Sequence, residues 1–201
     1  FLALLVTILS LCLVLPSAFY ASQDSFFSKL LCSTALIPFF LPVNIGSILI
    51  YQIFQDFFSL FSIDGRGTLV GLVLAHGFYE APIVIFYAAV ALRSIPSIYF
   101  DQMKEDKLSL FQQCFFSIRM IRTQIIQAAT IIFLYIFQST ALVMNIGLGR
   151  YQTLESAILL ALGHRGNFAQ AVGLSIIQSL LLCGIFHFGN MFAFQVNGRI
   201  E

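Results

Sequence analysis

Charged residues leave long apolar gaps along this chain, and the gaps have the length of membrane spans. Charges are absent from four stretches, and Glu80 alone interrupts a fifth; the five are residues 1–23, 30–55, 67–92, 123–149 and 166–198. A helix needs about 20 mostly apolar residues to cross about 30 Å of hydrocarbon. In lipid each backbone polar group must be satisfied within its own segment, so runs of this kind predict helices. We therefore expect an all-α transmembrane bundle with about five spans, near residues 2–22, 31–54, 68–92, 123–145 and 171–194.

Composition supports a membrane protein. The chain is 59% hydrophobic and 9% charged, its mean hydropathy is +0.94, and its net charge is +1. Soluble domains carry about 25% charged residues. A nearly neutral chain gives no reason to expect a nucleic-acid partner. The first residue is not Met and already belongs to an apolar run, so we expect residues 1–201 to be a single transmembrane domain that is a fragment, or one half, of a longer polypeptide.

Residues 94–122 form the one large charged loop. The segment from Arg93 to Arg122 holds eight of the nineteen charged residues, and apolar side chains are interleaved with them. This pattern predicts a helix over 97–106, a break at 107–109 and a second helix over 110–119. An apolar patch of this kind must be covered either by the bundle itself or by another protein. Both readings stand, and docking of a helix into a groove of a cytoplasmic partner is favoured.

Basic residues predict which side of the membrane each loop faces. Five spans would place seven basic residues on one side and three on the other; the seven are Lys29, Arg93, Lys104, Lys107, Arg119, Arg122 and Arg199. The richer side is expected to be cytoplasmic. Loop 94–122 and the C-terminus are therefore predicted to be cytoplasmic.

Two loops are predicted on the outer side. Residues 55–66 mix aromatic and aliphatic side chains with Asp56 and Asp64, as in a short amphipathic segment at the interface. Residues 146–170 are long for a connection, and 151–162 reads as a short helix with Thr153 as its N-cap. This outer helix either docks a partner or is a purely structural hairpin.

Four segments together resemble a known family. They are Leu-Ile-Pro-Phe-Phe-Leu-Pro at 36–42, Leu-Ala-His-Gly-Phe-Tyr-Glu-Ala-Pro at 74–82, Ala-Leu-Arg-Ser-Ile-Pro at 91–96 and Asn-Ile-Gly-Leu-Gly-Arg-Tyr-Gln-Thr-Leu-Glu-Ser-Ala-Ile at 145–158. In order and spacing they resemble the permease subunit of binding-protein-dependent (type I) ABC importers of the iron(III)/thiamine branch. The likeness is to the N-terminal half of the fused permease and runs through nearly the whole chain.

The family's hallmark is a cytoplasmic Glu-Ala-Ala loop, which forms the coupling helix seated on the ATPase. Here Asp101, Gln102 and Met103 stand where Glu-Ala-Ala would be, Asp106 stands at the Gly, and Arg119 stands at the Pro. The resemblance implies an ATPase-coupling surface at this loop, made of Asp101, Gln102, Met103, Glu105, Asp106, Leu110, Phe111, Phe115 and Arg119.

The resemblance also implies a function. The chain would form the translocation path for a small solute, of the iron(III) or thiamine class, in a bacterial inner membrane. Its expected partners are a cytoplasmic ABC ATPase dimer, a periplasmic solute-binding protein docked on the outer loops, and a second permease half. ATP would be bound and hydrolysed by the ATPase subunit, so no cofactor, metal or catalytic residue is expected in this chain.

Polar residues and prolines within the spans are candidates for the pathway lining. Prolines in the second span predict a bent or broken helix, and broken helices at mid-membrane often line a path. Glu80 is the one acid inside a span, and His76 lies one turn before it, within hydrogen-bonding reach along the helix. The candidates are Pro38, Pro42, Asn44, His76, Glu80, Gln138 and Asn145. His76 and Glu80 would form either a proton relay or cation site, or a pair that satisfies a kink near Gly77 and Pro82.

Two other functions remain open from the residues alone. One is a non-transporting membrane scaffold whose cytoplasmic loop binds a soluble protein. The other is an intramembrane enzyme built around His76 and Glu80, although the chain has no phosphate-binding Gly-rich loop, no GxSxG and no HExxH.

Overall fold

The computed structural model describes residues 1–21, 26–35, 37–59, 67–163 and 166–197, and all regular structure in these ranges is helical. The elements are α1 (Leu2–Ala21), α2 (Phe26–Ala35), α3 (Ile37–Phe40), α4 (Val43–Ser59), α5 (Leu69–Arg93), α6 (Ser97–Glu105), α7 (Leu110–Met120), α8 (Arg122–Phe137), α9 (Ala141–Gly147), α10 (Leu154–Gly163) and α11 (Phe168–Asn197). The predicted all-α class is confirmed. Three helices, α1, α5 and α11, are long and apolar enough to cross a membrane, which fits a membrane protein.

Two of the five predicted spans are not continuous helices. Residues 31–54 are divided among α2, α3 and α4, and the described break between α3 and α4 lies at Leu41 and Pro42. Proline lacks the backbone N–H and clashes with the preceding turn, which explains this break. Residues 123–145 are divided at Gln138–Thr140 between α8 and α9. A fourth span is reached only if α7 and α8 count together, and these two helices meet at a bend of 74°.

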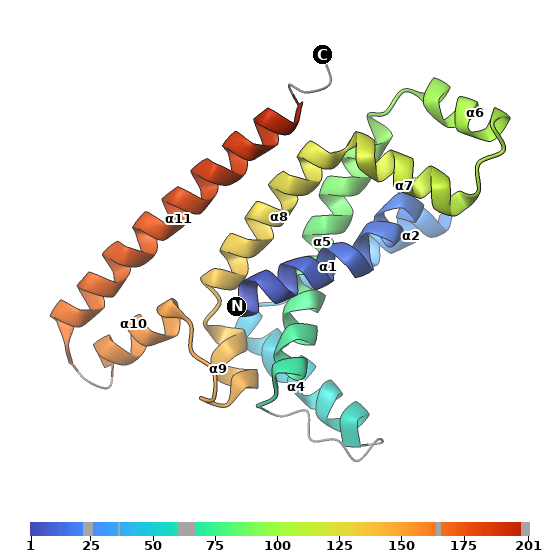
Figure 1. Cartoon of the computed structure of the whole chain (residues 1–201). Helices are drawn as coiled ribbons and strands as arrows, with labels where there is room; N and C mark the ends of the chain where they lie inside the picture. Colours follow the sequence, from blue (N-terminus) through green and yellow to red (C-terminus); the bar gives the residue numbers. More distant parts are fainter. Residues whose placement is uncertain (22–25, 36, 60–66, 164–165, 198–201) are drawn as a thin grey trace.

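α5 is the central helix of the bundle. Thr68 caps its first turn by accepting a hydrogen bond from the Gly71 N–H (3.1 Å), and Arg93 lies in its last turn. Its apolar side chains are buried on more than one face: Val84 packs with α1 and α8, whereas Leu72 packs with α4 and α9. In Figure 1, α1 crosses α5, α8 runs alongside α5, and α11 packs on α8.

The charged loop is a helical hairpin, as predicted. α6 and α7 are separated by 106–109, where Lys107 takes a positive φ of 53°. Ser109 and Gln112 form a capping box at the start of α7: the Ser109 N–H donates to Gln112 Oε1 at 2.9 Å, and Ser109 Oγ accepts from the Gln112 N–H. The turn is thus stabilised by its own hydrogen bonds, and the two helices hold a defined arrangement.

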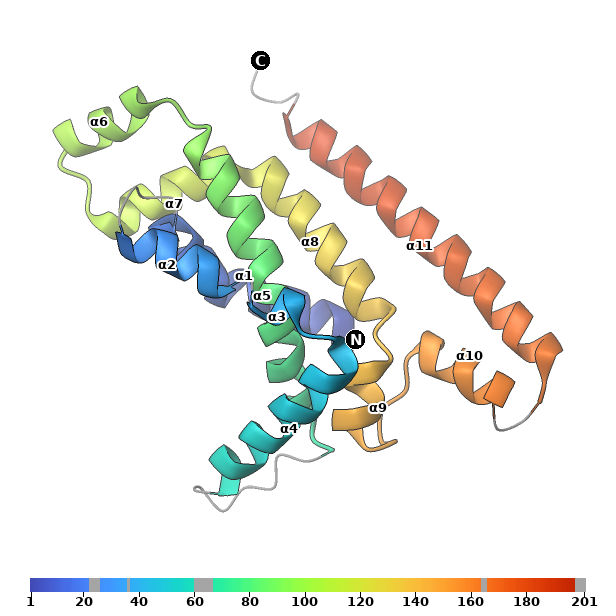
Figure 2. The same cartoon turned by 180° about the vertical axis from the view of Figure 1, so that it is seen from behind.

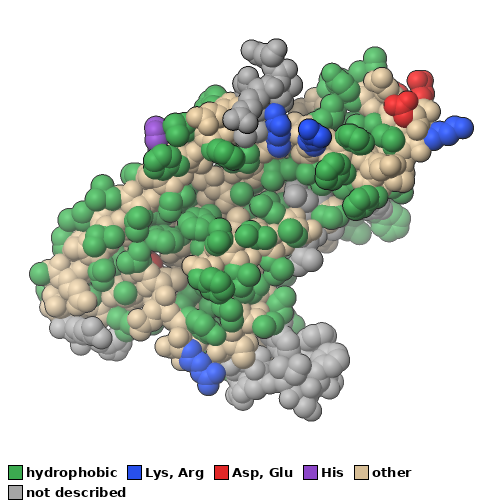
Figure 3. All heavy atoms as spheres, in the orientation of Figure 1, with side chains coloured by type: hydrophobic (Ala, Val, Ile, Leu, Met, Phe, Trp, Pro, Cys, Tyr) green, Lys and Arg blue, Asp and Glu red, His purple; other side chains and the backbone are tan. Residues whose placement is uncertain are grey.

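The ends of the bundle are chemically different. The α6–α7 hairpin and the C-terminal end of α11 lie at one end, whereas α10 and the C-terminal end of α4 lie at the other (Figures 1 and 2). Acidic and basic side chains gather at the end that carries α6, and hydrophobic side chains cover much of the face between the ends (Figure 3). Loop 94–122 and the C-terminal end of α11 therefore lie at the same end of the bundle.

The predicted outer helix over 151–162 is α10. Thr153 caps it as expected: its Oγ1 accepts from the Ser156 N–H at 3.2 Å. Gln178 of α11 donates to Glu155 of α10 at 2.6 Å, which ties these two helices together. Of the predicted interfacial segment 55–66, residues through Ser59 belong to α4, and the remainder lies outside the described residues.

Candidate functional site

The two helix breaks in the bundle face the same side of α5. The first lies around α3 and the start of α4, and the second is the link Gln138–Thr140 between α8 and α9. Between them is a cavity of about 350 Å³, whose wall includes both breaks. At membrane depth, non-helical backbone is tolerated where it is buried in protein or lines a water-filled cavity. The meeting of two breaks at one cavity therefore marks the candidate site.

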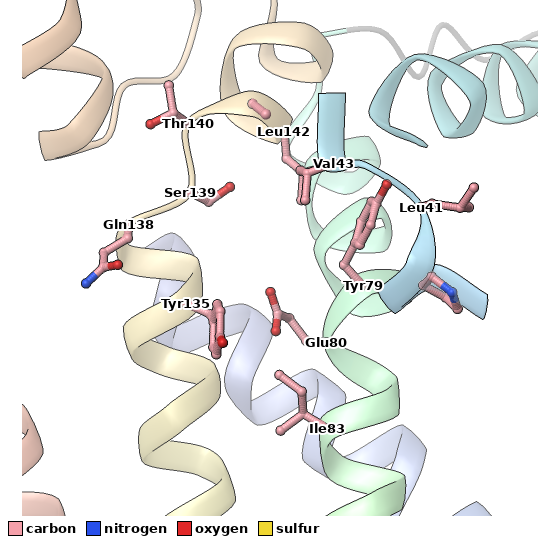
Figure 4. Close-up of a pocket in the computed structure, with 12 residues that line it drawn as sticks. Leu41, Val43, Tyr79, Glu80, Ile83, Tyr135, Gln138, Ser139, Thr140 and Leu142 are labelled. Carbon is pink, nitrogen blue, oxygen red and sulfur yellow. The ribbon is translucent and has the colours of Figure 1, made fainter. Parts of the chain in front are cut away.

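The cavity has a polar side and an apolar side. Its polar lining comes from α5, from the end of α8 and from the 138–140 link, and its apolar lining comes mainly from the other break. The lining residues are Pro38, Leu41, Val43, Tyr79, Glu80, Ile83, Tyr135, Gln138, Ser139, Thr140, Ala141 and Leu142. In Figure 4 the Glu80 carboxylate points from α5 into the space between α5 and α8, toward Tyr135.

Glu80 carries the only formal charge in this lining. It lies near the midpoint of the 25-residue helix α5, and its side chain is 7% exposed. Within the described part of the chain, no ion pair or hydrogen bond is formed by its carboxylate. A buried charge is costly unless it is paired, and ionisable residues inside membrane spans are candidates for function.

The predicted contact between His76 and Glu80 is not formed. Both ring nitrogens of His76 are buried and lack hydrogen-bond partners, although the two residues are one helical turn apart. His76 is fully buried and is not part of the cavity lining. Glu80 points toward α8, so no direct hydrogen bond joins the two side chains, and their role as a relay, a cation site or a kink-satisfying pair stays a prediction.

Two hydroxyl groups of the lining also lack partners. The Tyr79 hydroxyl and Thr140 Oγ1 are both buried without a hydrogen bond among the described residues. Tyr79 stands close to α4, where a Cβ added to Gly46 would overlap its hydroxyl. Buried polar atoms are normally hydrogen-bonded, so each unsatisfied group calls for a ligand, a water molecule or a structural reason.

The predicted candidates Asn44 and Asn145 serve a contact between helices. Asn145 Nδ2 of α9 donates to Ser47 Oγ of α4 at 2.7 Å, and Ser47 Oγ donates to the Asn44 carbonyl at 2.8 Å. Ser47 is fully buried. Of the seven predicted pathway residues, the structure brings together Pro38, Glu80 and Gln138 at the cavity, whereas Pro42, Asn44, His76 and Asn145 lie outside its lining.

The predicted docking loop leaves its apolar side chains uncovered. Leu110, Phe111 and Phe115 of α7 are 73%, 82% and 57% exposed. Of the remaining predicted coupling residues, Asp101, Gln102, Glu105, Asp106 and Arg119 are exposed and Met103 is half-buried. α6 has no buried residue, whereas α7 contacts α1 and buries Ser117. One face of α7 therefore packs on the bundle, its other face and α6 are uncovered in this chain, and both interpretations of the loop stay open.

Two tyrosines of the site were not predicted. Tyr79 precedes Glu80, and Tyr135 lies three residues before Gln138, on the same side of α8. Their positions relative to Glu80 and Gln138 are the only feature of the sequence that could have identified them as lining residues. Within the described ranges, no three His, Cys, Asp or Glu side chains gather closely enough to hold a metal ion.

A scan of protein-family models and a search of curated proteins found no match to this chain.

Proposed function

We propose that this chain is the permease component of an ATP-driven importer of the binding-protein-dependent type. It forms the translocation path for a small solute of the iron(III) or thiamine class, together with a second permease half. A periplasmic solute-binding protein delivers the solute, and a cytoplasmic ABC ATPase dimer hydrolyses ATP. The proposed location is a bacterial inner membrane, with loop 94–122 and the C-terminus in the cytoplasm.

The observation that carries this proposal is the α6–α7 hairpin. Its turn is stabilised by its own hydrogen bonds, α7 contacts the bundle through α1, and Leu110, Phe111 and Phe115 are exposed. Aromatic anchors on a short amphipathic helix suit a groove in a soluble partner. The sequence pattern resembles coupling loops at this same position.

The cavity at the two helix breaks supports a transport role. Broken helices near the bilayer midplane are typical of solute pathways. The α5–α8 cavity has one open side, where Tyr135 is 56% exposed and Gln138 is also exposed. A second permease half packed on this side would complete the path between the two halves.

Co-purification tests the docking surface. The full-length protein is co-expressed with the ABC ATPase encoded nearest to it, and affinity purification is followed by quantification of the ATPase. Replacement of Phe111 and Phe115 by Ala is expected to reduce the recovered ATPase at least tenfold, because buried aromatic anchors dominate interfaces of this kind. ATP hydrolysis by the complex is expected to fall in parallel.

Phe168→Ala is the matched control, because Phe168 is 69% exposed at the start of α11, at the other end of the molecule. It should leave ATPase recovery unchanged. If the wild-type protein inserts in membranes but holds no ATPase, the importer proposal fails. Recovery of a different soluble protein through Phe111 and Phe115 would instead favour a membrane scaffold.

A further inference from the structure

We propose that the Glu80 cavity is a binding site for a small organic monocation with an apolar or aromatic body. This inference rests on the proposed transport function, because it assigns the chemical class of solute that the path accepts. The site is defined by the Glu80 carboxylate, the Tyr79 and Tyr135 side chains, and the polar link Gln138–Thr140.

Charge sets the sign of the ligand. Glu80 is the one formally charged residue lining the cavity, and the described residues provide its carboxylate with neither a counter-ion nor a hydrogen-bond donor. Away from bulk water, the attraction between opposite charges is several-fold stronger than at the protein surface. A cation entering this cavity would favour the ionised carboxylate and supply its counter-charge, whereas an anion would find no opposite charge in the lining.

The rings and apolar wall favour an organic cation. Tyr135 lies across the cavity from Glu80 and comes from a different helix, so a cation between them would meet a carboxylate on one side and an aromatic ring on the other (Figure 4). Cation–π contacts contribute most where the cation is desolvated. Leu41, Val43 and Ile83 provide the apolar surface for the remainder of such a ligand.

The number of oxygen ligands argues against a bare metal ion. Divalent hard cations take six or more oxygen ligands, and multivalent cations are usually held by several carboxylates. This lining has one carboxylate, and the described residues contain no cluster of three metal-ligating side chains. A weakly hydrated monocation needs fewer oxygens, so the donor set fits it better.

Size and unpaired polar groups complete the fit. A volume of about 350 Å³ falls within the range of small-molecule pockets. Thr140 and Tyr79 belong to the lining, and their hydroxyl groups are buried without partners among the described residues. The exposed positions of Tyr135 and Gln138 leave the cavity open on one side.

Calorimetric titration of the full-length protein in lipid nanodiscs tests the site. Three probes share a benzyl body and a tetrahedral head group but differ in charge: benzyltrimethylammonium, neutral benzyl methyl sulfone and anionic benzylsulfonate. We expect the cation to bind at least tenfold more tightly than the sulfone, and the sulfonate not to bind. Glu80→Gln should abolish that preference: the affinity for the cation should fall at least tenfold, whereas the affinity for the sulfone should change less than twofold.

Two further variants make the result independent of one side chain. Tyr135→Leu, at an exposed position, should weaken the cation several-fold without unfolding the protein. Glu155→Gln removes an acid on α10 that is outside the cavity and should leave all three affinities unchanged. If Glu80→Gln fails to insert, the charge preference of the wild type and the Tyr135→Leu titration decide the question.

The inference is overturned if the wild type binds none of the probes, binds cation and sulfone equally, or keeps its charge preference after Glu80→Gln. Its failure is separable from failure of the proposed function. A protein that recruits the ATPase through Phe111 but shows no charge preference would refute the cation site alone. Glu80-dependent cation binding in a protein that never recruits an ATPase would refute the importer alone.

Discussion

α5 and α11 are nearly equal in apolar character but opposite in burial. The apolar stretches of the two helices have mean hydropathies of 1.8 and 1.9. In α5, 61% of this stretch is buried, whereas in α11 only 11% is buried. α5 carries small buried residues such as Gly71, Ala75 and Ala88, which allow neighbouring helices to approach. α11 presents large side chains outward, including Leu180, Phe188 and Phe194, and packs against α8 and α10.

The difference teaches that hydropathy alone does not determine packing in a lipid environment. Lipid tails are as apolar as Leu, so an apolar helix gains little merely by leaving lipid for protein. Close approach and polar contacts between helices decide which spans associate. α5 is packed against several helices and is closely approached by Gly46 of α4, whereas α11 packs mainly against α8 and α10, with a close approach at Gly189 and a hydrogen bond from Gln178.

The largest expected effect comes from adding one methyl group beside α5. Gly46→Ala places a Cβ where the Tyr79 hydroxyl lies, so α4 or Tyr79 must shift. Overpacking of this kind costs about 1–3 kcal/mol, and we expect the upper half of that range. The free energy of unfolding, followed by circular dichroism during SDS titration in mixed micelles, measures the loss.

Gly184→Ala on α11 is the matched control, because a Cβ there meets no atom within 4 Å. It should be neutral or slightly stabilising, since Ala is the better helix former. In a protein that already carries Tyr79→Ala, Gly46→Ala should leave the free energy of unfolding nearly unchanged. Equal losses for Gly46→Ala and Gly184→Ala would refute the contrast between the two helices.

An intermediate effect is expected where α11 approaches α8. Gly189→Ala would overlap the Thr130 side chain, but α11 is mostly exposed along its length and can shift outward at this point. We expect a loss of about 1 kcal/mol, at the low end of overpacking costs. The same SDS titration measures this loss of unfolding free energy. Adding Thr130→Ala to Gly189→Ala should recover most of it. If no stability is recovered, the overlap with Thr130 is not the cause of the loss.

The smallest effect is expected from the loss of a hydrogen bond between α4 and α9. Ser47→Ala removes the hydroxyl that joins Asn145 to the Asn44 carbonyl. Hydrogen bonds between membrane helices contribute about 0.6 kcal/mol on average, so the expected loss of unfolding free energy is of that order. Ser179→Ala, on the exposed side of α11, should change it by less. A loss above that of Gly189→Ala would reverse the proposed order.

The sequence was informative where local pattern determines structure. Long apolar runs with at most one charged residue predicted α1, α5 and α11, because length and apolarity suffice for a span. Charges interleaved with aromatics predicted α6, α7 and the break between them, and Thr153 predicted the start of α10. In each case the residues that determine the element lie within it or next to it.

The cavity could not be predicted in the same way, because its parts are distant in sequence. Pro38, Glu80 and Gln138 come from three helical segments, and only their packing brings them together. The break at Gln138–Thr140 contains neither Pro nor Gly, so no local signal marked it. His76 and Glu80 show the reverse case: a spacing that permits contact in a helix did not produce one, because tertiary neighbours set the direction of each side chain.

The bend between α7 and α8 connects the exposed surface of α7 to the Glu80 cavity at the far end of α8. Hydrogen bonds continue through it, from the Ile121 N–H to the Ser117 carbonyl and from the Ile125 N–H to the Ile121 carbonyl, and Ile121 itself is buried. The 16 residues of α8 make a rod about 24 Å long, at 1.5 Å per residue. If the corner stays rigid, a tilt of about 10° imposed on α7 would swing the far end of that rod, with Tyr135 and Gln138, by about 4 Å. A partner bound to α7 would therefore change the width of the Glu80 cavity without contacting the residues that line the cavity.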